Sequence, residues 1–126
     1  MSLGPTAGTV AFVQTADRLP AEAFYRDVIG LKFSGFDGFG SVFEIAGGTL
    51  RPTEIAGFAP HPYPALGWQV GDITRAVAGL IASGVGMERY EGLGQDDQGI
   101  WTAPDGKVRI VWFKDPDGNL LSLTQA

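Results

Sequence analysis

Cysteine and histidine, the residue types most often used as nucleophiles and metal ligands, are nearly absent from this 126-residue sequence. No cysteine is present, which excludes disulfides, thiolate metal sites and a cysteine nucleophile. The one histidine, His61, lies in a proline-rich segment, where we expect a surface position. No serine or threonine has an evident histidine partner, and the glycine-rich segments match neither a phosphate-binding loop nor a dinucleotide-binding motif. Thiol, serine–histidine and nucleotide-phosphate chemistry are therefore not expected.

Composition places the chain among globular proteins. Hydrophobic residues make up 44% and charged residues 18%, and the length suits a single domain over residues 1–126. A net charge of -5 argues against nucleic acid or an anionic membrane surface as a partner, since both would repel the chain. No stretch approaches the roughly 20 apolar residues of a membrane span. The sequence shows no secretory signal, so we expect a cytoplasmic location.

The first half of the chain predicts a strand, a helix and three further strands. Residues 9–15 are rich in β-formers. Asp17 leads into a helix whose apolar face carries Ala21, Phe24, Tyr25 and Val28 at helical spacing, and Gly30 ends it. Three extended segments follow, at 31–39, 41–46 and 49–55.

The same pattern returns after a linker at 56–64, in which three prolines prevent a regular element. A strand is predicted at 65–70, and Asp72 caps a helix that stops at Gly84. Further strands are predicted at 87–90, 100–103, 108–114 and 119–125. The acidic, glycine-rich loop at 92–99 is predicted to be flexible, either as a flap over a pocket or as a surface turn.

The two halves align at a constant offset of 55 residues. The segment from Val13 to Asp17 matches the segment from Trp68 to Asp72, and a helix follows each. Such a repeat predicts a duplicated βαβββ unit. We therefore expect an α+β fold with modules at 8–55 and 65–125. Two unrelated halves with similar strand-to-helix junctions are the alternative.

Three motifs resemble the vicinal oxygen chelate superfamily, which includes glyoxalases, extradiol dioxygenases and bleomycin resistance proteins. They are the helix segment 24–31 (FYRDVIGL), the mid-chain strand 67–73 (GWQVGDI) and the closing hairpin 112–119 (WFKDPDGN). The resemblance covers residues 8–125. It implies tandem βαβββ modules that form a concave, half-barrel mixed sheet with helices on the outer face.

The resemblance also implies where a divalent metal would be bound. The four ligand positions fall at Val10, at Ala65, within Pro52–Glu54 and at Ser122. Only Glu54 among them carries a carboxylate, whereas a divalent ion needs three or four oxygen or nitrogen ligands. We therefore expect no metal cofactor, although this departs from the metal-dependent enzymes of the superfamily.

Strand alternation then predicts the lining of the cleft. Val10, Phe12 and Gln14 share one face of the first strand. Ala65, Gly67 and Gln69 share a face of the mid-chain strand, and Leu120, Ser122 and Thr124 share a face of the last. The predicted ligand-binding residues are Phe12, Gln14, Gln69, Trp101, Trp112 and Ser122.

Three functions are compatible with these residues. The first is a metal-free protein, similar to bleomycin resistance proteins, that binds a small apolar or aromatic molecule, including a cationic one. The second is a lyase, isomerase or dioxygenase-type enzyme with an atypical or lost metal site, in which Glu54 is the general base. The third is an interaction module without a small ligand. The resemblance implies a homodimer for the first two.

Overall fold

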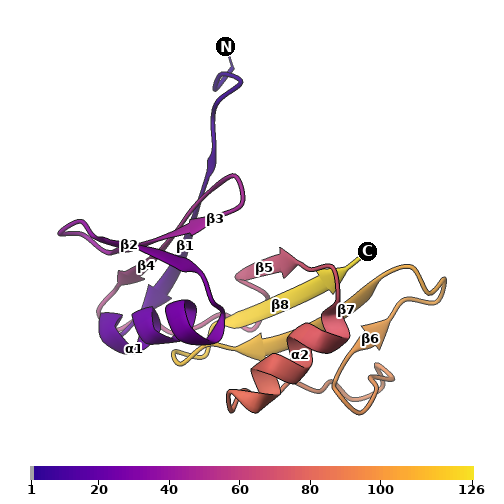
Figure 1. Ribbon diagram of the computed structural model, residues 1–126. Coiled ribbons are helices and arrows are strands. Elements are labelled where there is room, and N and C mark those ends of the chain that lie inside the picture. The colour runs from indigo at the N-terminus through magenta and orange to yellow at the C-terminus, as the bar shows by residue number, and fades with distance from the viewer. Residues whose placement is uncertain (1) are drawn as a thin grey trace. The chain divides into compact units, whose positions relative to one another are not determined.

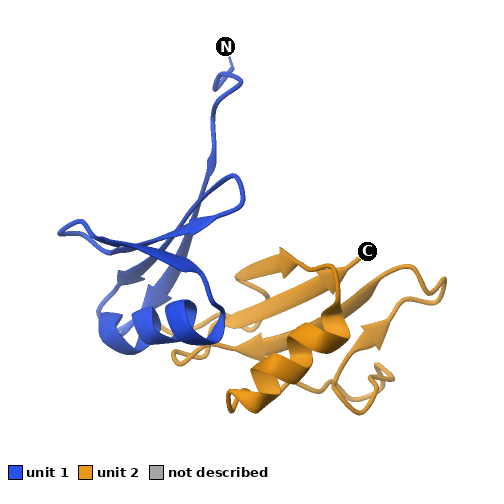
Figure 2. Ribbon diagram, viewed as in Figure 1, with its two compact units in different colours: residues 1–58 blue, residues 59–126 orange. Residues whose placement is uncertain are grey.

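The computed structural model describes residues 2–126, so Met1 of the predicted domain lies outside the described part. The chain forms two compact units, one reaching to Phe58 and the other running from Ala59 to Ala126 (Figure 2). Each unit contains a four-stranded mixed sheet and helical structure between its first and second strands (Figure 1). This is the predicted α+β class with two βαβββ modules.

The first module has the strand order β1-β4-β3-β2. Its strands are β1 (Thr9–Thr15), β2 (Lys32–Phe36), β3 (Ser41–Ile45) and β4 (Gly48–Glu54). The outer strand β1 pairs in parallel with β4, whereas β4 with β3 and β3 with β2 are antiparallel. A parallel pair needs a crossover connection, and the helical segment after β1 begins that connection.

The first helical segment consists of α1 (Arg18–Ala23) followed directly by a π-helical turn, η1 (Phe24–Val28). Asp17 is the N-cap, and its carboxylate accepts from the Leu19 N–H at 3.2 Å. The segment ends at Gly30, whose φ of 84° is left-handed, as predicted for the cap. Of the predicted apolar face, Ala21, Phe24 and Tyr25 are buried and Val28 is half-buried. The π-turn itself was not predicted.

A buried polar contact holds α1 against the sheet. Glu22 lies on α1 and is only 7% exposed. Its carboxylate accepts from Arg18 Nη1 at 2.5 Å and from the Ser41 hydroxyl on β3. The Arg18 guanidinium in turn lies 4.1 Å above the ring of Phe36. The helix is therefore attached to the sheet by a charged group that has partners, in addition to apolar packing.

The second module repeats this topology with the order β5-β8-β7-β6. Its strands are β5 (Leu66–Gln69), β6 (Trp101–Thr102), β7 (Arg109–Lys114) and β8 (Leu120–Gln125). Again the first strand pairs in parallel with the last, and the remaining pairs are antiparallel. Figure 1 shows α2 (Ile73–Ala82) lying across one face of this sheet.

The α2 helix begins as predicted. Asp72 accepts from the Arg75 N–H at 3.1 Å, and the side chain of Gln125 on β8 accepts from the Ile73 N–H at 2.8 Å. Ile73, Val77 and Leu80 are buried on α2. The sheet side of this core consists of Val111, Phe113, Leu121 and Leu123.

Between α2 and β6 the structure has less strand than predicted. The segment 87–90 makes one bridge, Met87 to Phe113, and Glu88 N–H donates to the Trp112 carbonyl at 2.8 Å. The loop at 92–99 is tied by Gln95, which donates to the carbonyls of Glu88 and Gly99 and accepts from the Tyr90 N–H. No helix among the described residues has the length and apolar character needed to cross a bilayer.

The closing hairpin is built on Asp115, which is only 6% exposed. Its carboxylate accepts from the backbone N–H groups of Asp117 and Asn119 and from the Asn119 side chain, each at 2.9 Å. Gly118, with φ of 85°, supplies the left-handed turn position. The predicted tight turn is confirmed, and Asp115 is its organising residue.

We expect Asp115→Ala to lower the free energy of unfolding by about 1–3 kcal/mol, because it leaves buried donors of the turn without an acceptor. Urea denaturation followed by circular dichroism measures this. Asp105→Ala is the matched control, since Asp105 accepts only from the exposed Lys107 N–H, and it should cost less than about 1 kcal/mol. Equal losses in the two variants would show that Asp115 has no special role.

The Ser41 hydroxyl can be tested in the same way. Ser41→Ala removes a donor to the buried Glu22 carboxylate and should cost about 1–3 kcal/mol. Ser34→Ala, at an exposed position on β2, should stay within about 0.5 kcal/mol of the parent chain. A Ser41→Ala variant as stable as Ser34→Ala would contradict the role given to the Glu22 contact.

Candidate functional site

The second module has one sheet face that no helix of that module covers. Its register aligns Gln69 with Thr124, Thr124 with Ile110, and Ile110 with Trp101 across all four strands. The neighbouring row aligns Gly67 with Ser122 and Ser122 with Trp112. Residues that pair across strands project from the same face of a sheet. The structure therefore brings the predicted residues Gln69, Trp101, Trp112 and Ser122 onto one face.

The opposite face of the same sheet is the core. Val111, Phe113, Leu121 and Leu123 alternate with the open-face residues along β7 and β8 and are at most 6% exposed. Trp101, Trp112 and Ser122 are half-buried, and Gln69 is exposed. The open face thus carries two large aromatic rings, one amide and one hydroxyl.

Gly67 gives the Ser122 side chain its space. A side chain on Gly67 would collide with the Ser122 hydroxyl oxygen and come within 3.3 Å of its carbonyl oxygen. The absence of a Cβ at this position therefore lets the hydroxyl lie over the neighbouring strand.

Tyr90 extends the open face beyond Trp112. Their ring centroids lie 5.5 Å apart with an interplanar angle of 86°, an edge-to-face contact. Tyr90 comes from the segment between α2 and β6. Its backbone N–H donates a hydrogen bond to the side-chain oxygen of Gln95. The aromatic surface therefore continues past the edge of β7.

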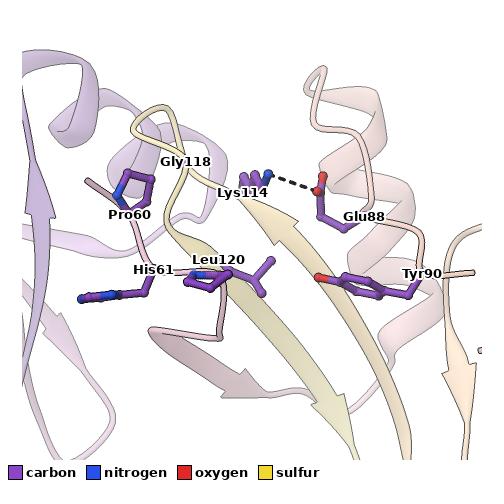
Figure 3. A pocket seen from close by; sticks show the side chains of 8 residues that line it. Pro60, His61, Glu88, Tyr90, Lys114, Gly118 and Leu120 are labelled. Carbon is purple, nitrogen blue, oxygen red and sulfur yellow. Dashed lines mark ion pairs between the residues drawn. The ribbon is translucent and has the colours of Figure 1, made fainter. Parts of the chain in front are cut away.

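At this end of the sheet the second module contains a pocket of about 390 Å³ (Figure 3). Leu120, which pairs with Lys114, belongs to the same face of β8 as Ser122. The Lys114 ammonium nitrogen lies 3.4 Å from a carboxylate oxygen of Glu88. The remaining lining residues are Pro60, His61, Pro62, Tyr90 and Gly118. The pocket thus combines apolar and aromatic walls with one ion pair.

The sequence did not indicate this pocket. Residues 56–64 were predicted only as a linker, yet Pro60, His61 and Pro62 line the cavity. His61 remains exposed, as predicted, and its ring stacks on Tyr63 at a centroid distance of 4.8 Å. No sequence pattern joins these prolines to Glu88 and Lys114, which are distant in the chain.

The first module also has an open sheet face. Phe12 aligns with Arg51 and Gln14 with Thr53, and Val10 and Phe12 are 53% and 62% exposed. Gln14 is exposed as well. Phe12 and Gln14 therefore share a face, as strand alternation predicted.

A charged pair borders this face. Arg51 donates to the Asp37 carboxylate, and this hydrogen bond, together with the backbone N–H groups of Phe39 and Gly40, lowers the pKa of Asp37 to about 2. At neutral pH the Asp37 carboxylate is therefore ionised and accepts hydrogen bonds from Arg51 and from its own loop.

Glu54 lies on the other side of this sheet. It aligns with the buried Thr15, and it alternates along β4 with residues of the open face, so it belongs to the helix side. Its carboxylate oxygen is 3.8 Å from Arg18 Nε on α1, and its side chain is 56% exposed. The structure does not bring Glu54 together with Gln14.

The side chains at the four positions implied for a metal offer few donor atoms. Val10 and Ala65 have hydrocarbon side chains without donor atoms, Ser122 offers a neutral hydroxyl, and Glu54 belongs to the helix side of its sheet. These four side chains do not supply the three or four oxygen or nitrogen donors that a divalent ion requires. Within residues 2–126, no three His, Asp or Glu side chains form a group that could hold a metal ion.

Comparisons by sequence give no relatives. No family model matches the chain, and no curated protein sequence matches it.

Solved structures give several matches over almost the whole chain. A member of the Glyoxalase/bleomycin resistance protein/dioxygenase superfamily from Sphaerobacter thermophilus has a TM-score of 0.75 at 21% identity, covering 95% of this chain and 97% of that one. The genomically encoded fosfomycin resistance protein FosX from Listeria monocytogenes has a TM-score of 0.76 at 18% identity, covering 100% and 95%. Lactoylglutathione lyase from Agrobacterium tumefaciens has a TM-score of 0.69 at 22% identity, covering 98% and 96%.

These matches agree with the two βαβββ modules. The chain has the fold of the glyoxalase/bleomycin resistance protein/dioxygenase superfamily.

Proposed function

We propose that this chain is a small-molecule-binding protein that takes a largely apolar or aromatic ligand on the open sheet face of its second module, without a metal ion. The observation that carries the proposal is the shared face of Trp101, Trp112, Gln69 and Ser122. Ligand sites of this kind combine a large apolar surface with a few polar groups that fix orientation.

The polar groups of this face suit binding better than proton transfer. The amide of Gln69 and the hydroxyls of Ser122 and Thr124 donate and accept hydrogen bonds but do not ionise near neutral pH, so they are poor general acids and bases. The two indole rings supply area for stacking at a low cost in conformational entropy. A flat, aromatic ligand with one or two polar substituents fits this combination.

An enzyme of the same fold is the second candidate, because lactoylglutathione lyase from Agrobacterium tumefaciens shares the fold. Glu54 would then be the general base. Its ion pair with Arg18 and its place on the helix side of its sheet argue against that role. Unchanged turnover in Glu54→Ala, for any substrate that the chain is found to convert, would exclude Glu54 as the base.

Homodimerisation, which the resemblance implies, belongs to the proposal. β1 is an edge strand of the first sheet, and its open face exposes Val10 and Phe12. An edge strand with exposed apolar side chains can pair with a second copy.

Light scattering coupled to size exclusion should therefore give about twice the chain mass of 13.3 kDa. Phe12→Ser is expected to shift the mass toward that of the monomer, since it removes exposed apolar surface from β1. A monomeric parent chain at micromolar concentration would contradict the dimer.

The ligand site can be tested with the three tryptophans of the chain. Trp101 and Trp112 lie on the open face, whereas Trp68 alternates with Gly67 and Gln69 on β5 and belongs to the helix side. A panel of planar aromatic compounds should quench tryptophan fluorescence. Trp112→Ala should weaken the binding of a compound that quenches by about 5- to 30-fold, because aromatic anchors contribute over 1 kcal/mol.

Trp68→Phe is the matched control, which should keep both the quenching and the affinity. Quenching that vanishes in Trp68→Phe but persists in a Trp101→Phe, Trp112→Phe double variant would place the ligand elsewhere. A fluorescence signal that no compound changes would count against the binding function itself.

A further inference from the structure

The pocket at the Leu120 end of the open face is lined by the ion pair of Glu88 with Lys114 and by the imidazole of His61. Figure 3 shows the side chains of the ion pair directed toward one another, with the Tyr90 ring pointing toward Leu120. The pocket and the open face are continuous through Tyr90, which contacts Trp112 edge-to-face. A ligand on the indole rings would therefore have the ion pair within reach of one end.

The two members of this ion pair are unequally exposed. The Glu88 side chain is 33% exposed and the Lys114 side chain 54%. A lysine side chain has four rotatable bonds and can move its ammonium group into water at little cost. The carboxylate is less accessible to water, so it gains more than the ammonium group from having a partner of opposite charge.

We infer that the pocket selects ligands that end in a protonated amine, which takes the place of Lys114 beside the Glu88 carboxylate. This inference rests on the proposed function and assigns the charged end of the same ligand. Glu88 is then the specificity-determining residue, and Lys114 is a built-in competitor that occupies the site when no ligand is bound.

An anionic ligand would meet the opposite situation. It would have to draw Lys114 away from Glu88, which would leave the less exposed carboxylate without a partner and close to a like charge. The chain as a whole carries a net charge of -5, which adds to the repulsion. The unequal exposure of Glu88 and Lys114 therefore favours a cationic ligand over an anionic one.

The walls of the pocket suit an alkylammonium group. The aromatic ring of Tyr90 lines the pocket, and its contact with Trp112 restricts its orientation. The pyrrolidine rings of Pro60 and Pro62 and the side chain of Leu120 offer apolar contact to the methylene groups next to the amine. A primary or secondary amine on a short apolar chain attached to an aromatic group matches this lining.

Three probes that share a phenyl ring and a two-carbon spacer but differ in charge test the selection. They are 2-phenylethylammonium, 2-phenylethanol and 3-phenylpropanoate, each titrated into the purified full chain and followed by chemical shifts of the Trp and Tyr90 signals. We expect the cation to bind at least about fivefold more tightly than the neutral alcohol and the anion to bind most weakly. Equal affinities of the cation and the alcohol would overturn the inference.

Substitutions in the ion pair give a sharper test, because the two halves should act in opposite directions. Glu88→Gln should lower the cation-to-alcohol affinity ratio by about fivefold, whereas Lys114→Gln should raise that ratio by about two- to fivefold. A pair that only stabilises the fold would give the same direction in both variants. Far-UV circular dichroism and thermal melts verify that both variants are folded.

Lys32 and Glu44 provide the matched control pair. Their ammonium and carboxylate groups lie 3.3 Å apart between β2 and β3 of the first module, and both are exposed. Lys32→Gln and Glu44→Gln change the net charge of the chain by the same amount, and we expect neither to alter the cation-to-alcohol affinity ratio. If these variants changed the ratio as much as the Glu88 and Lys114 variants do, the change in net charge alone would explain the effect. That result would overturn the role given to Glu88.

The experiment separates the two levels of the proposal. If none of the three probes nor any compound of the aromatic panel binds, the proposed function itself fails. If the alcohol and the cation bind with equal affinity, or if both variants of the ion pair act in the same direction, the binding function stands and the selection by Glu88 fails.

Discussion

Parallel pairing of the first and last strands is the constraint on which each module depends. In the first module β1 pairs with β4, and in the second β5 pairs with β8. Two parallel neighbours cannot be joined by a tight turn, so the chain must cross over the sheet, and here it crosses with a helix at the start. The crossover covers one sheet face with apolar side chains and leaves the other face without a helix. The open faces that carry the candidate site are thus a direct consequence of strand order.

Register then decides which side chains appear on those faces. The Asp115 turn joins β7 to β8, and it fixes Trp112 opposite Ser122 and Lys114 opposite Leu120. A shift by one residue would move all of them to the core side and place Phe113 and Leu121 in water. Because Asp115 is buried and accepts three hydrogen bonds, the turn has little freedom to shift. A stability determinant in the turn therefore also determines the composition of the site.

The features that the sequence predicts well are local or periodic. Asp17 and Asp72 cap their helices, Gly30 ends the first helical segment, and β1 alternates between core and open face as expected. Each depends on residues within one or two turns of the chain, for which propensity and period carry the information. The 55-residue offset also predicts a long-range feature, the same strand and helix order in both halves, because a repeated unit implies a repeated topology.

The features that the sequence misses depend on register or on contacts between distant segments. The metal-ligand position on β4 was limited only to Pro52–Glu54, and a change of one residue within that range changes the sheet face. The pocket joins Pro60 and Pro62, Glu88 and Tyr90, and Lys114 with Leu120, three segments that no periodicity connects. The π-helical turn at Phe24–Val28 also escaped prediction, since its apolar spacing is that of an ordinary helix.

Charge on the open face of the second module lies at one end only. Its central residues, Gln69, Ser122 and the two indoles, are neutral. A neutral face can attract many aromatic molecules but cannot distinguish a cation from its neutral analogue beyond the modest cation–π term. In the proposed site, discrimination by charge would therefore come from the rim, where Glu88 and Lys114 form an ion pair with unequal exposure. A charged pair at the edge keeps the desolvation cost low, because neither group is fully buried, and under the proposal it would still favour one sign of charge on the ligand.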